Sequence, residues 1–363
     1  MKKIAIVTIN DNNNYGNRLQ NYAVQETIKK IGKFNVITIK NLPRFNNKGT
    51  LLHMIKKIIA QMYSNIKKYI SNNRKRSKCF KNFNKNIKFS YNYKTIYSNM
   101  NNKFDYFIVG SDQVWKPTYG RMSQMDLLSF ADPGKRISFS ASFGVDKLKE
   151  NEKRRAKKEL EKFKAISVRE EAGKKIIENL KINKNVEVLV DPTMLLSDKE
   201  WNTVIKKVDG VEKKKYILNY FLGNLSETRK KEIDKIAQKY DCKVINLLDK
   251  NDEFYKTGPS EFLYLEKEAF LVCTDSFHSS VFSIIFDTPF IVFDREDNNV
   301  NMNSRIDTLL RKFNLEDRRF NGKITDKLLK CDYTDAKKIL KIEKEKSNAF
   351  LKKALDIDRK DTI

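Results

Sequence analysis

The chain has 363 residues, with 73 Lys and Arg against 46 Asp and Glu and a formal net charge of +27. Its length is sufficient for two domains that each bury a core. A hydrophobic content of 40% excludes a wholly disordered chain. Four scattered Cys without a C-x-x-C pair exclude a disulfide scaffold and a zinc knuckle, and two His exclude a multi-histidine metal site.

The apolar segments are too short for a signal sequence or a membrane span. The first, Ile4 to Val7, ends in the polar run 10–14, and no later stretch approaches the length of a membrane-spanning helix. We therefore expect a cytoplasmic protein.

The excess of positive charge comes mainly from Lys, which outnumbers Arg by 57 to 16. Arg is the side chain that contacts phosphate through two points, and the Lys residues are spread over the whole chain, so we expect no nucleic-acid partner. Residues 51–70 place an apolar stripe at helical spacing, with Lys residues off the stripe. The stripe consists of Leu51, Ile55, Ile58, Met62, Ile66 and Tyr69, and Lys56, Lys57, Lys67 and Lys68 lie off it. This segment either packs on its own domain or makes a peripheral contact with the inner face of the membrane.

Apolar runs typical of strands alternate with periodic, helix-like segments through most of the chain. The strand-like runs are 3–9, 35–39, 104–109, 136–142, 165–168 and 186–190 in the first half, and 216–221, 243–247, 270–273 and 289–293 in the second. The helix-like segments are 17–31, 51–86, 147–162, 170–181, 226–240, 260–268, 277–286, 303–313 and 333–356. This alternation predicts an α/β fold of two Rossmann-like domains facing a cleft, residues 1–200 and 201–363, the second with a C-terminal helix.

Ligands of parallel sheets bind beyond the carboxyl ends of the strands, so we expect the chemistry in the loops that follow strands. After the first run, Gly16 and Asn17 begin a helix whose free N–H groups either receive an anion or a sugar hydroxyl, or form an ordinary capped turn. After the run 104–109, Ser111, Asp112 and Trp115 either bind a sugar or cap a helix and fill the core.

Two further loops carry ionisable side chains. Arg169 follows the run 165–168, where it either clamps a carboxylate or phosphate or pairs with a neighbouring Glu. His278 opens a predicted helix after the run 270–273, where it is presented to the cleft as a proton donor or acceptor. A helix N-terminus disfavours the imidazolium, so we expect the charge state of His278 to depend on the ligand.

Five motifs in this order, NYGNRLQNYA, VGSDQVW, SVRE, VDPT and TDSFHSSVFSIIF, resemble the polysaccharide pyruvyl transferase family over about residues 1–315. The resemblance implies two Rossmann-like domains arranged as in two-domain glycosyltransferases, with the acceptor on the side of the first and the donor on the side of the second. It also implies transfer from phosphoenolpyruvate onto two hydroxyls of a cell-surface polysaccharide or its precursor, free or lipid-linked, which gives a cyclic pyruvate ketal.

The resemblance also implies roles for single residues. It makes His278 the catalytic residue beside the donor and Arg169 a ligand of the donor's negative charges. Many family members have an Arg two positions before the His, where this chain has Ser276, and Arg305 is the candidate for the missing cation. The expected donor-binding residues are Arg169, Arg305, Ser276 and Ser279, and the expected acceptor-binding residues are Asn17, Ser111, Asp112 and Trp115.

The chemistry that the resemblance implies fits these residues without a metal or a cofactor. Protonation of the donor's methylene carbon creates an oxocarbenium-like centre that a sugar hydroxyl attacks before phosphate leaves. Two alternatives stay open. A nucleotide-sugar glycosyltransferase of similar fold would use Glu261 for the ribose, and a non-catalytic saccharide-binding protein would keep Trp115 but not need His278. The acceptor sugar, the linkage and the oligomeric state are not readable from the sequence.

Overall fold

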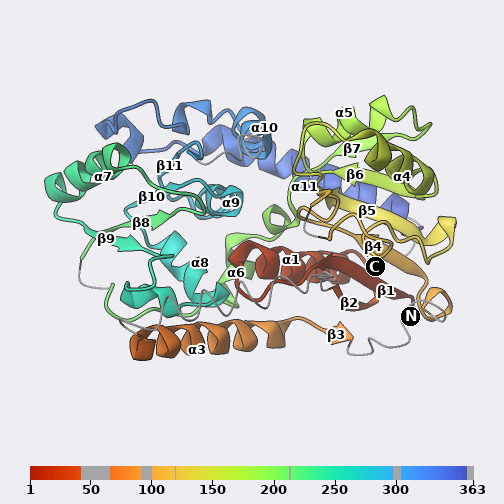
Figure 1. The fold of residues 1–363 in the computed structure, drawn as a ribbon, viewed down its shortest axis with the longest axis horizontal. Coiled ribbons are helices and arrows are strands. Elements are labelled where there is room, and N and C mark those ends of the chain that lie inside the picture. Colours follow the sequence, from red (N-terminus) through yellow and green to blue (C-terminus); the bar gives the residue numbers. More distant parts are fainter. Residues whose placement is uncertain (42–65, 91–99, 119, 212–213, 297–303, 358–363) are drawn as a thin grey trace.

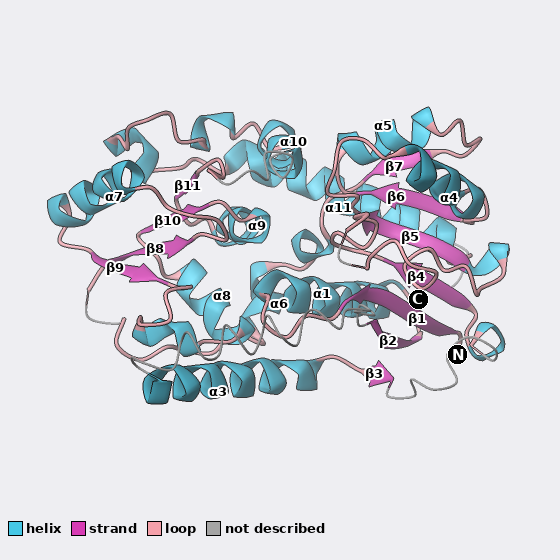
Figure 2. Ribbon diagram, in the orientation of Figure 1, coloured by secondary structure: helices cyan, strands magenta, loops and turns pink. Residues whose placement is uncertain are grey.

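The computed structural model describes residues 1–41, 66–90, 100–118, 120–211, 214–296 and 304–357. These residues form two separate β-sheets with helices packed around them (Figure 1, Figure 2). All strand pairs in both sheets are parallel. The predicted α/β class with two parallel sheets is therefore confirmed.

The first sheet has seven strands in the order β3-β2-β1-β4-β5-β6-β7. Its strands are β1 (Lys3–Ile9), β2 (Asn35–Asn41), β3 (Phe89–Ser90), β4 (Tyr106–Val109), β5 (Arg136–Ala141), β6 (Ala165–Val168) and β7 (Val186–Val188). The interior strands β4 and β5 are buried at every residue, as expected for strands that are covered by helices on both faces. The edge strand β3 was not predicted, because two residues are too few to show a pattern.

The second sheet has four strands in the order β11-β10-β8-β9. Its strands are β8 (Tyr216–Tyr220), β9 (Lys243–Asn246), β10 (Leu271–Thr274) and β11 (Phe290–Val292). The two interior strands, β8 and β10, are also buried along their whole length, whereas the edge strand β9 is largely exposed or half-buried. The other edge strand, β11, is buried throughout, so a place at the edge of the sheet does not by itself expose a strand.

Helices connect the strands of both sheets. The α-helices are α1 (Tyr15–Ile31), α3 (Ile66–Phe83), α4 (Glu150–Leu160), α5 (Glu171–Asn179), α6 (Asp198–Asn202), α7 (Glu227–Lys239), α8 (Pro259–Lys267), α9 (Phe277–Phe286), α10 (Ser304–Lys312) and α11 (Thr334–Ala354). The short 3-10 helices are η1 (Asn84–Asn86), η2 (Asn101–Lys103), η3 (Pro133–Lys135), η4 (Pro192–Leu195), η5 (Glu253–Lys256), η7 (Glu316–Arg318) and η8 (Asp326–Leu329). Within the described part of the chain, no helix combines the length and the apolar character that a bilayer crossing requires.

The largest hydrophobic core runs through both halves of the molecule. It includes residues of the first sheet and residues of α8 and α9 beside the second sheet. At its centre, Tyr15 of α1 stacks on Phe262 of α8, with ring centroids 4.6 Å apart. The shared core therefore holds the two sheets in one structure, because separating them would expose these aromatic rings.

Two helices pack on the half of the molecule to which they do not belong in sequence. α3 follows the first strands but contacts η5 and α8 of the second half, and α11 returns from the end of the chain to the first sheet (Figure 1). Phe350 of α11 stacks on Phe139 of β5, and the hydroxyl of Tyr106 donates to Asp356 at 2.6 Å. The boundary between residues 1–200 and 201–363 therefore stays a prediction.

The predicted amphipathic segment 51–70 lies mostly outside the described residues. The structure places residues 66–70 in the first turns of α3 and describes no side chains there. The choice between a core stripe and a membrane contact for this segment is therefore not decided by the described residues.

Candidate active site

The candidate site consists of side chains that follow strands of both sheets. Asn17 lies in the first turn of α1 after β1, Asp112 follows β4, and Arg169 follows β6. His278 is the second residue of α9, which follows β10 of the second sheet, and Arg305 is the second residue of α10. These residues converge because the carboxyl ends of parallel strands lie at the same edge of a sheet.

Arg169 is the centre of a buried network of ion pairs. Its Nη1 lies 2.7 Å from Oδ2 of Asp191, and its Nη2 lies 3.3 Å from Oδ1 of Asp112. Its guanidinium lies over the ring of Phe277, 4.5 Å from the centroid. The sequence left open a pairing with a neighbouring Glu, and Nε does lie 4.0 Å from Oε2 of Glu170, but the closer partners follow two other strands. The network therefore ties three strand ends of the first sheet together.

Asp112 brings the predicted acceptor-side residues into the same network. The side-chain amide of Asn17 donates to its Oδ2, and the backbone N–H of Gln113 donates to its Oδ1 at 2.8 Å. Asp112 has a φ of 72°, in the left-handed region that few residues other than Gly adopt. The hydroxyl of Ser111 donates to Oδ2 of Asp191 at 2.8 Å. Polar contacts thus hold Asn17, Ser111 and Asp112 together, with the backbone of Asp112 in a strained conformation.

His278 lies where the N-termini of two helices meet. Its ring packs against Gly16 in the first turn of α1, so closely that a Cβ on that residue would lie 2.7 Å from Cε1 of the ring. On the other side, Nε2 lies 3.8 Å from Oδ2 of Asp191. Each helix N-terminus contributes partial positive charge, so this point favours a bound anion.

Arg305 brings a second buried guanidinium to the ring of Phe277, 5.9 Å from the centroid. Its Nε has no hydrogen-bond partner among the described residues, and the same holds for Nε of Arg169 and Nε2 of His278. Buried polar atoms are nearly always hydrogen-bonded in folded proteins. Three buried nitrogens without a hydrogen-bond partner in one cluster therefore indicate a place for a ligand that supplies acceptors.

The two carboxylates of the cluster are ionised at neutral pH. Burial alone raises the pKa of Asp191, but the nearby charges of His278 and Arg169 outweigh burial and lower that pKa to about 2. Burial also raises the pKa of Asp112, and Arg169 and His278 again outweigh it, so that this pKa lies below its usual value. Ionised carboxylates keep Arg169 fixed in its network.

Burial lowers the pKa of both basic side chains that face this network. Burial lowers the pKa of His278 below its usual value, because it disfavours the imidazolium more than Asp191 and Asp112 favour it. Burial also lowers the pKa of Arg305 to about 10, and the charge of Arg169 acts in the same direction. Without a ligand, His278 is therefore neutral at pH 7, and a bound anion would favour its protonation.

Trp115 lies in the core of the first half, away from this network. It is 0% exposed, its ring packs against Phe143 and Phe163 at centroid distances of 5.1 and 5.8 Å, and its Nε1 donates to the carbonyl of Asp126 at 3.0 Å. In this position the ring presents no face to a sugar, because its aromatic neighbours cover it.

The two Ser residues beside His278 also have internal partners. The backbone N–H of Ser276 donates to Oγ1 of Thr274 at 3.0 Å, at the N-cap of α9. The hydroxyl of Ser279 donates to Glu266 of α8, which also accepts from Ser283 at 3.4 Å. Ser279 therefore points into the interface between α8 and α9 and not toward the Arg169 network.

Asp191 is the site residue that the sequence analysis missed. It accepts hydrogen bonds from Ser111 and Arg169 and faces His278. The signal was present, because Asp191 directly follows the strand-like run 186–190 and so stands at a strand end, as Asp112 does. Among the described residues, no group of three or more His, Cys, Asp or Glu is arranged to hold a metal ion.

Comparison with known proteins assigns a family. A family model described as polysaccharide pyruvyl transferase matches residues 14–298. No curated protein matches the chain. Among solved structures, a UDP-N-acetylglucosamine 2-epimerase from Rickettsia bellii is 11% identical, with a TM-score of 0.48 over 98% of this chain and 97% of that chain. A UDP-GlcNAc 2-epimerase from Neisseria meningitidis, bound to UDP-GlcNAc, is 11% identical, with a TM-score of 0.45 over 98% of both chains.

Proposed function

The chain belongs to the polysaccharide pyruvyl transferase family, and from this premise we propose that it moves a pyruvyl group from phosphoenolpyruvate to two hydroxyls of a cell-surface polysaccharide or its precursor. Family membership makes the protein a transferase that acts on a polysaccharide. The phosphoenolpyruvate donor, the ketal product, a lipid-linked acceptor and a cytoplasmic location are parts of the proposal. The supporting observation is the cluster of buried nitrogens on Arg169, His278 and Arg305 that have no hydrogen-bond partner among the described residues.

The donor carries a phosphate and a carboxylate, and the cluster offers cations suited to both. Arg169 is already bound to two carboxylates, whereas the guanidinium of Arg305 has no ion pair among the described residues. We therefore assign the larger share of donor binding to Arg305 and to the helix N-termini at Gly16 and His278. Arg169 contributes its Nε and its position over Phe277.

His278 acts as the general acid in this proposal. It transfers a proton to the methylene carbon of the donor, which becomes a methyl group, and the adjacent carbon becomes an oxocarbenium-like centre. One sugar hydroxyl attacks this carbon and loses its proton, the carbon–oxygen bond to phosphate breaks, and the second hydroxyl closes the ring with loss of its own proton. The products are a cyclic ketal and inorganic phosphate; one of the two hydroxyl protons restores His278 and the other leaves on the phosphate.

The acceptor hydroxyls lie beside Asp112 and Asn17 in this proposal. In the structure these two side chains bond to each other, at the edge of the network that holds Arg169. A hydroxyl can donate to the carboxylate of Asp112 and accept from the amide of Asn17, so that it takes the place of their direct hydrogen bond. Ser111 supports Asp191 and does not need to touch the acceptor.

Two observations favour this function over a nucleotide-sugar glycosyltransferase. The loop after β8 presents backbone N–H groups of Leu222 and Gly223, but both donate to the carboxylate of Asp275, at 2.7 and 2.8 Å. This internal carboxylate occupies donors that a nucleotide phosphate would otherwise use. Glu261, the candidate ribose ligand, accepts from the backbone N–H of Gly258 at 3.0 Å and so caps α8.

A non-catalytic saccharide-binding protein is also disfavoured. That alternative depends on an exposed aromatic platform at Trp115, and this ring is enclosed in the core. It also assigns no role to His278, which the structure places beside Asp191 and the first turn of α1.

The test is product formation from phosphoenolpyruvate with a panel of free and lipid-linked glycans, read by mass. Donor selectivity is measured separately, as the thermal shift caused by phosphoenolpyruvate compared with nucleotide sugars. We expect stabilisation by phosphoenolpyruvate that disappears when Arg305 is changed to Met. Stabilisation by a nucleotide sugar alone would reject the proposal in favour of glycosyl transfer.

A further inference from the structure

α3 has one buried face that fixes it to the rest of the molecule. Arg76, in the middle of this face, donates through Nη2 to the carbonyl of Asn13 at 3.1 Å and through Nη1 to the carbonyl of Thr257 at 3.2 Å. It also donates to the hydroxyl of Tyr15. One buried guanidinium thus links α3 to the start of α1 and to the loop before α8.

The opposite face of α3 is basic and exposed. Arg74 and Lys78 are each two residues from Arg76, which places them about 200° around the helix from it. Lys81 and, in η1 directly after α3, Lys85 continue the same stripe at helical spacing, and all four side chains are exposed. We call Arg74, Lys78, Lys81 and Lys85 the basic stripe.

The charge of the basic stripe is not balanced locally. α3 contains seven Lys or Arg and no Asp or Glu, whereas every other described α-helix with basic side chains also contains acidic ones. None of the four stripe residues forms an ion pair with any described residue. The stripe therefore presents concentrated positive charge to its surroundings.

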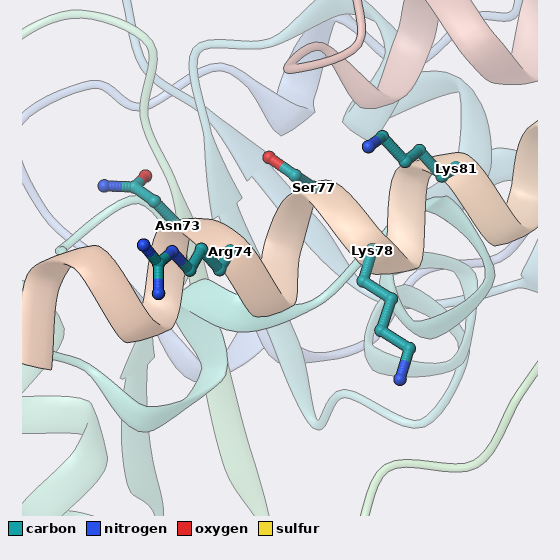
Figure 3. Close-up of a pocket in the computed structure, with 5 residues that line it drawn as sticks. All are labelled: Asn73, Arg74, Ser77, Lys78 and Lys81. Carbon is teal, nitrogen blue, oxygen red and sulfur yellow. The ribbon is translucent and has the colours of Figure 1, made fainter.

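A groove lies along the basic stripe. It has a volume of about 410 Å³ and is lined by Asn73, Arg74, Ser77, Lys78 and Lys81 (Figure 3). Three cations beside an amide and a hydroxyl form a set of donors that suits a phosphate group. No aromatic side chain lines the groove within the described residues, so it lacks the stacking platform of a single-stranded nucleic-acid site.

We propose that the basic stripe of α3 binds the phosphate headgroups of anionic lipids and so holds the protein at a membrane surface. α3 runs along one long edge of the molecule, beside both halves (Figure 1). The stripe points away from the buried face and its side chains are exposed, which suits contact with an anionic surface. Because Arg76 fixes α3 to the start of α1, binding through the stripe also fixes the orientation of the site that holds Asn17 relative to the membrane.

The proposal is tested by co-sedimentation with vesicles of phosphatidylcholine that contain phosphatidylglycerol, without donor or acceptor. The variant changes Arg74, Lys78, Lys81 and Lys85 to Gln. A matched control changes Lys230, Lys231, Lys235 and Lys239 to Gln, which removes four exposed charges from α7 on another edge of the molecule. Each basic residue near the surface contributes about tenfold or less, so we expect the stripe variant to bind about 10²- to 10³-fold more weakly than the control.

The wild type tests the membrane proposal in two further ways. Binding by the wild type should weaken steeply with salt and vanish on vesicles of phosphatidylcholine alone. Equal loss in the two variants, or no vesicle binding by the wild type, would overturn the proposal. So would a stripe variant that loses affinity for a 20-base-pair DNA duplex but not for vesicles. The vesicle experiment contains no substrate, so a lack of vesicle binding says nothing about the proposed reaction. Likewise, a lack of product from phosphoenolpyruvate does not affect the vesicle experiment.

Discussion

Gly16 of α1 lies directly against the imidazole of His278 on α9, so that the first turn of one helix forms a wall for the second residue of the other. A Cβ on Gly16 would lie 2.7 Å from Cε1 of the ring and closer still to Nδ1. Real Cβ contacts are essentially never that short, so the ring must move if a methyl group is added. The hydrogen side chain of Gly16 is therefore a requirement for the position of the imidazole.

Gly16→Ala should lower turnover at least about tenfold, because a displaced imidazole no longer reaches the donor. In a His278→Asn background the same change should cost nothing further, since its effect acts through the ring. Gly134→Ala is the matched control, because a Cβ there meets nothing within 4 Å. Nuclear magnetic resonance of the protein with labelled His rings distinguishes His53 from His278, because His53→Gln removes the His53 signal. The His278 signal should shift in Gly16→Ala and stay in place in Gly134→Ala. Equal loss of turnover in both backgrounds would contradict a positioning role.

His278→Asn should lower turnover at least about 10²-fold and leave the melting temperature close to that of the wild type. The free protein has a lowered His278 pKa, so the protonated form increases as pH falls below about 6.5. For the wild type, kcat/KM for the donor should therefore rise toward acid pH. A bound anion raises the pKa of His278, so the fall of kcat with rising pH should occur at a higher pH than the fall of kcat/KM. If His278→Asn kept the same fall of activity with rising pH, another group would have to supply the proton.

Arg305→Met should stabilise the unliganded protein while it weakens donor binding. A buried cation without an ion pair among the described residues costs about 1–3 kcal/mol, and its removal should raise Tm by about 2 °C per kcal/mol. The thermal shift caused by phosphoenolpyruvate should disappear in the same variant. An unchanged donor shift would remove Arg305 from the donor site.

Arg169→Lys should destabilise the fold, because a Lys cannot span Asp112 and Asp191 as the guanidinium does. The expected cost is about 3–5 kcal/mol, the usual result of breaking a buried ion pair. Donor KM of the folded fraction should also rise, since Nε of Arg169 is lost. If the melting temperature falls while donor KM stays constant, Arg169 has only a structural role.

Glu266→Gln should change the pH dependence of stability. Burial raises the pKa of Glu266 to about 8, with Ser279 and Ser283 as hydrogen-bond partners, so the folded state keeps a proton that the unfolded chain releases above about pH 4.5. The stability of the wild type should therefore be complete below pH 4.5 and fall as pH rises toward 8. Glu266→Gln should melt like the wild type at pH 5 and several degrees higher at pH 9. Parallel melting curves across this range would show that Glu266 is ionised in the folded protein.

The elements of the fold were predictable because their signals are local. Strands such as β6 and helices such as α9 agree with the predicted ranges, since a short apolar run or a capped periodic segment carries its own pattern. The rule that ligands bind beyond strand ends also singled out Asp112, Arg169 and His278, which the structure brings together although 166 residues separate the first from the last. The placement of His278 after a strand already predicted a proton donor or acceptor, and the family motifs added that it lies beside the donor.

The pairing of side chains was decided only by the tertiary structure. Trp115 follows a strand as Asp112 does, yet it turns into the core, because which way a loop side chain points depends on what packs against the loop. Asp191 stands next to Arg169 because β6 and β7 are neighbours in the sheet, and strand order is not written in any single strand. The sequence by itself determined the elements and the kinds of residue at their ends, since these follow from local chemistry. Their contacts follow from long-range packing, which brought Gly16 of one half against His278 of the other.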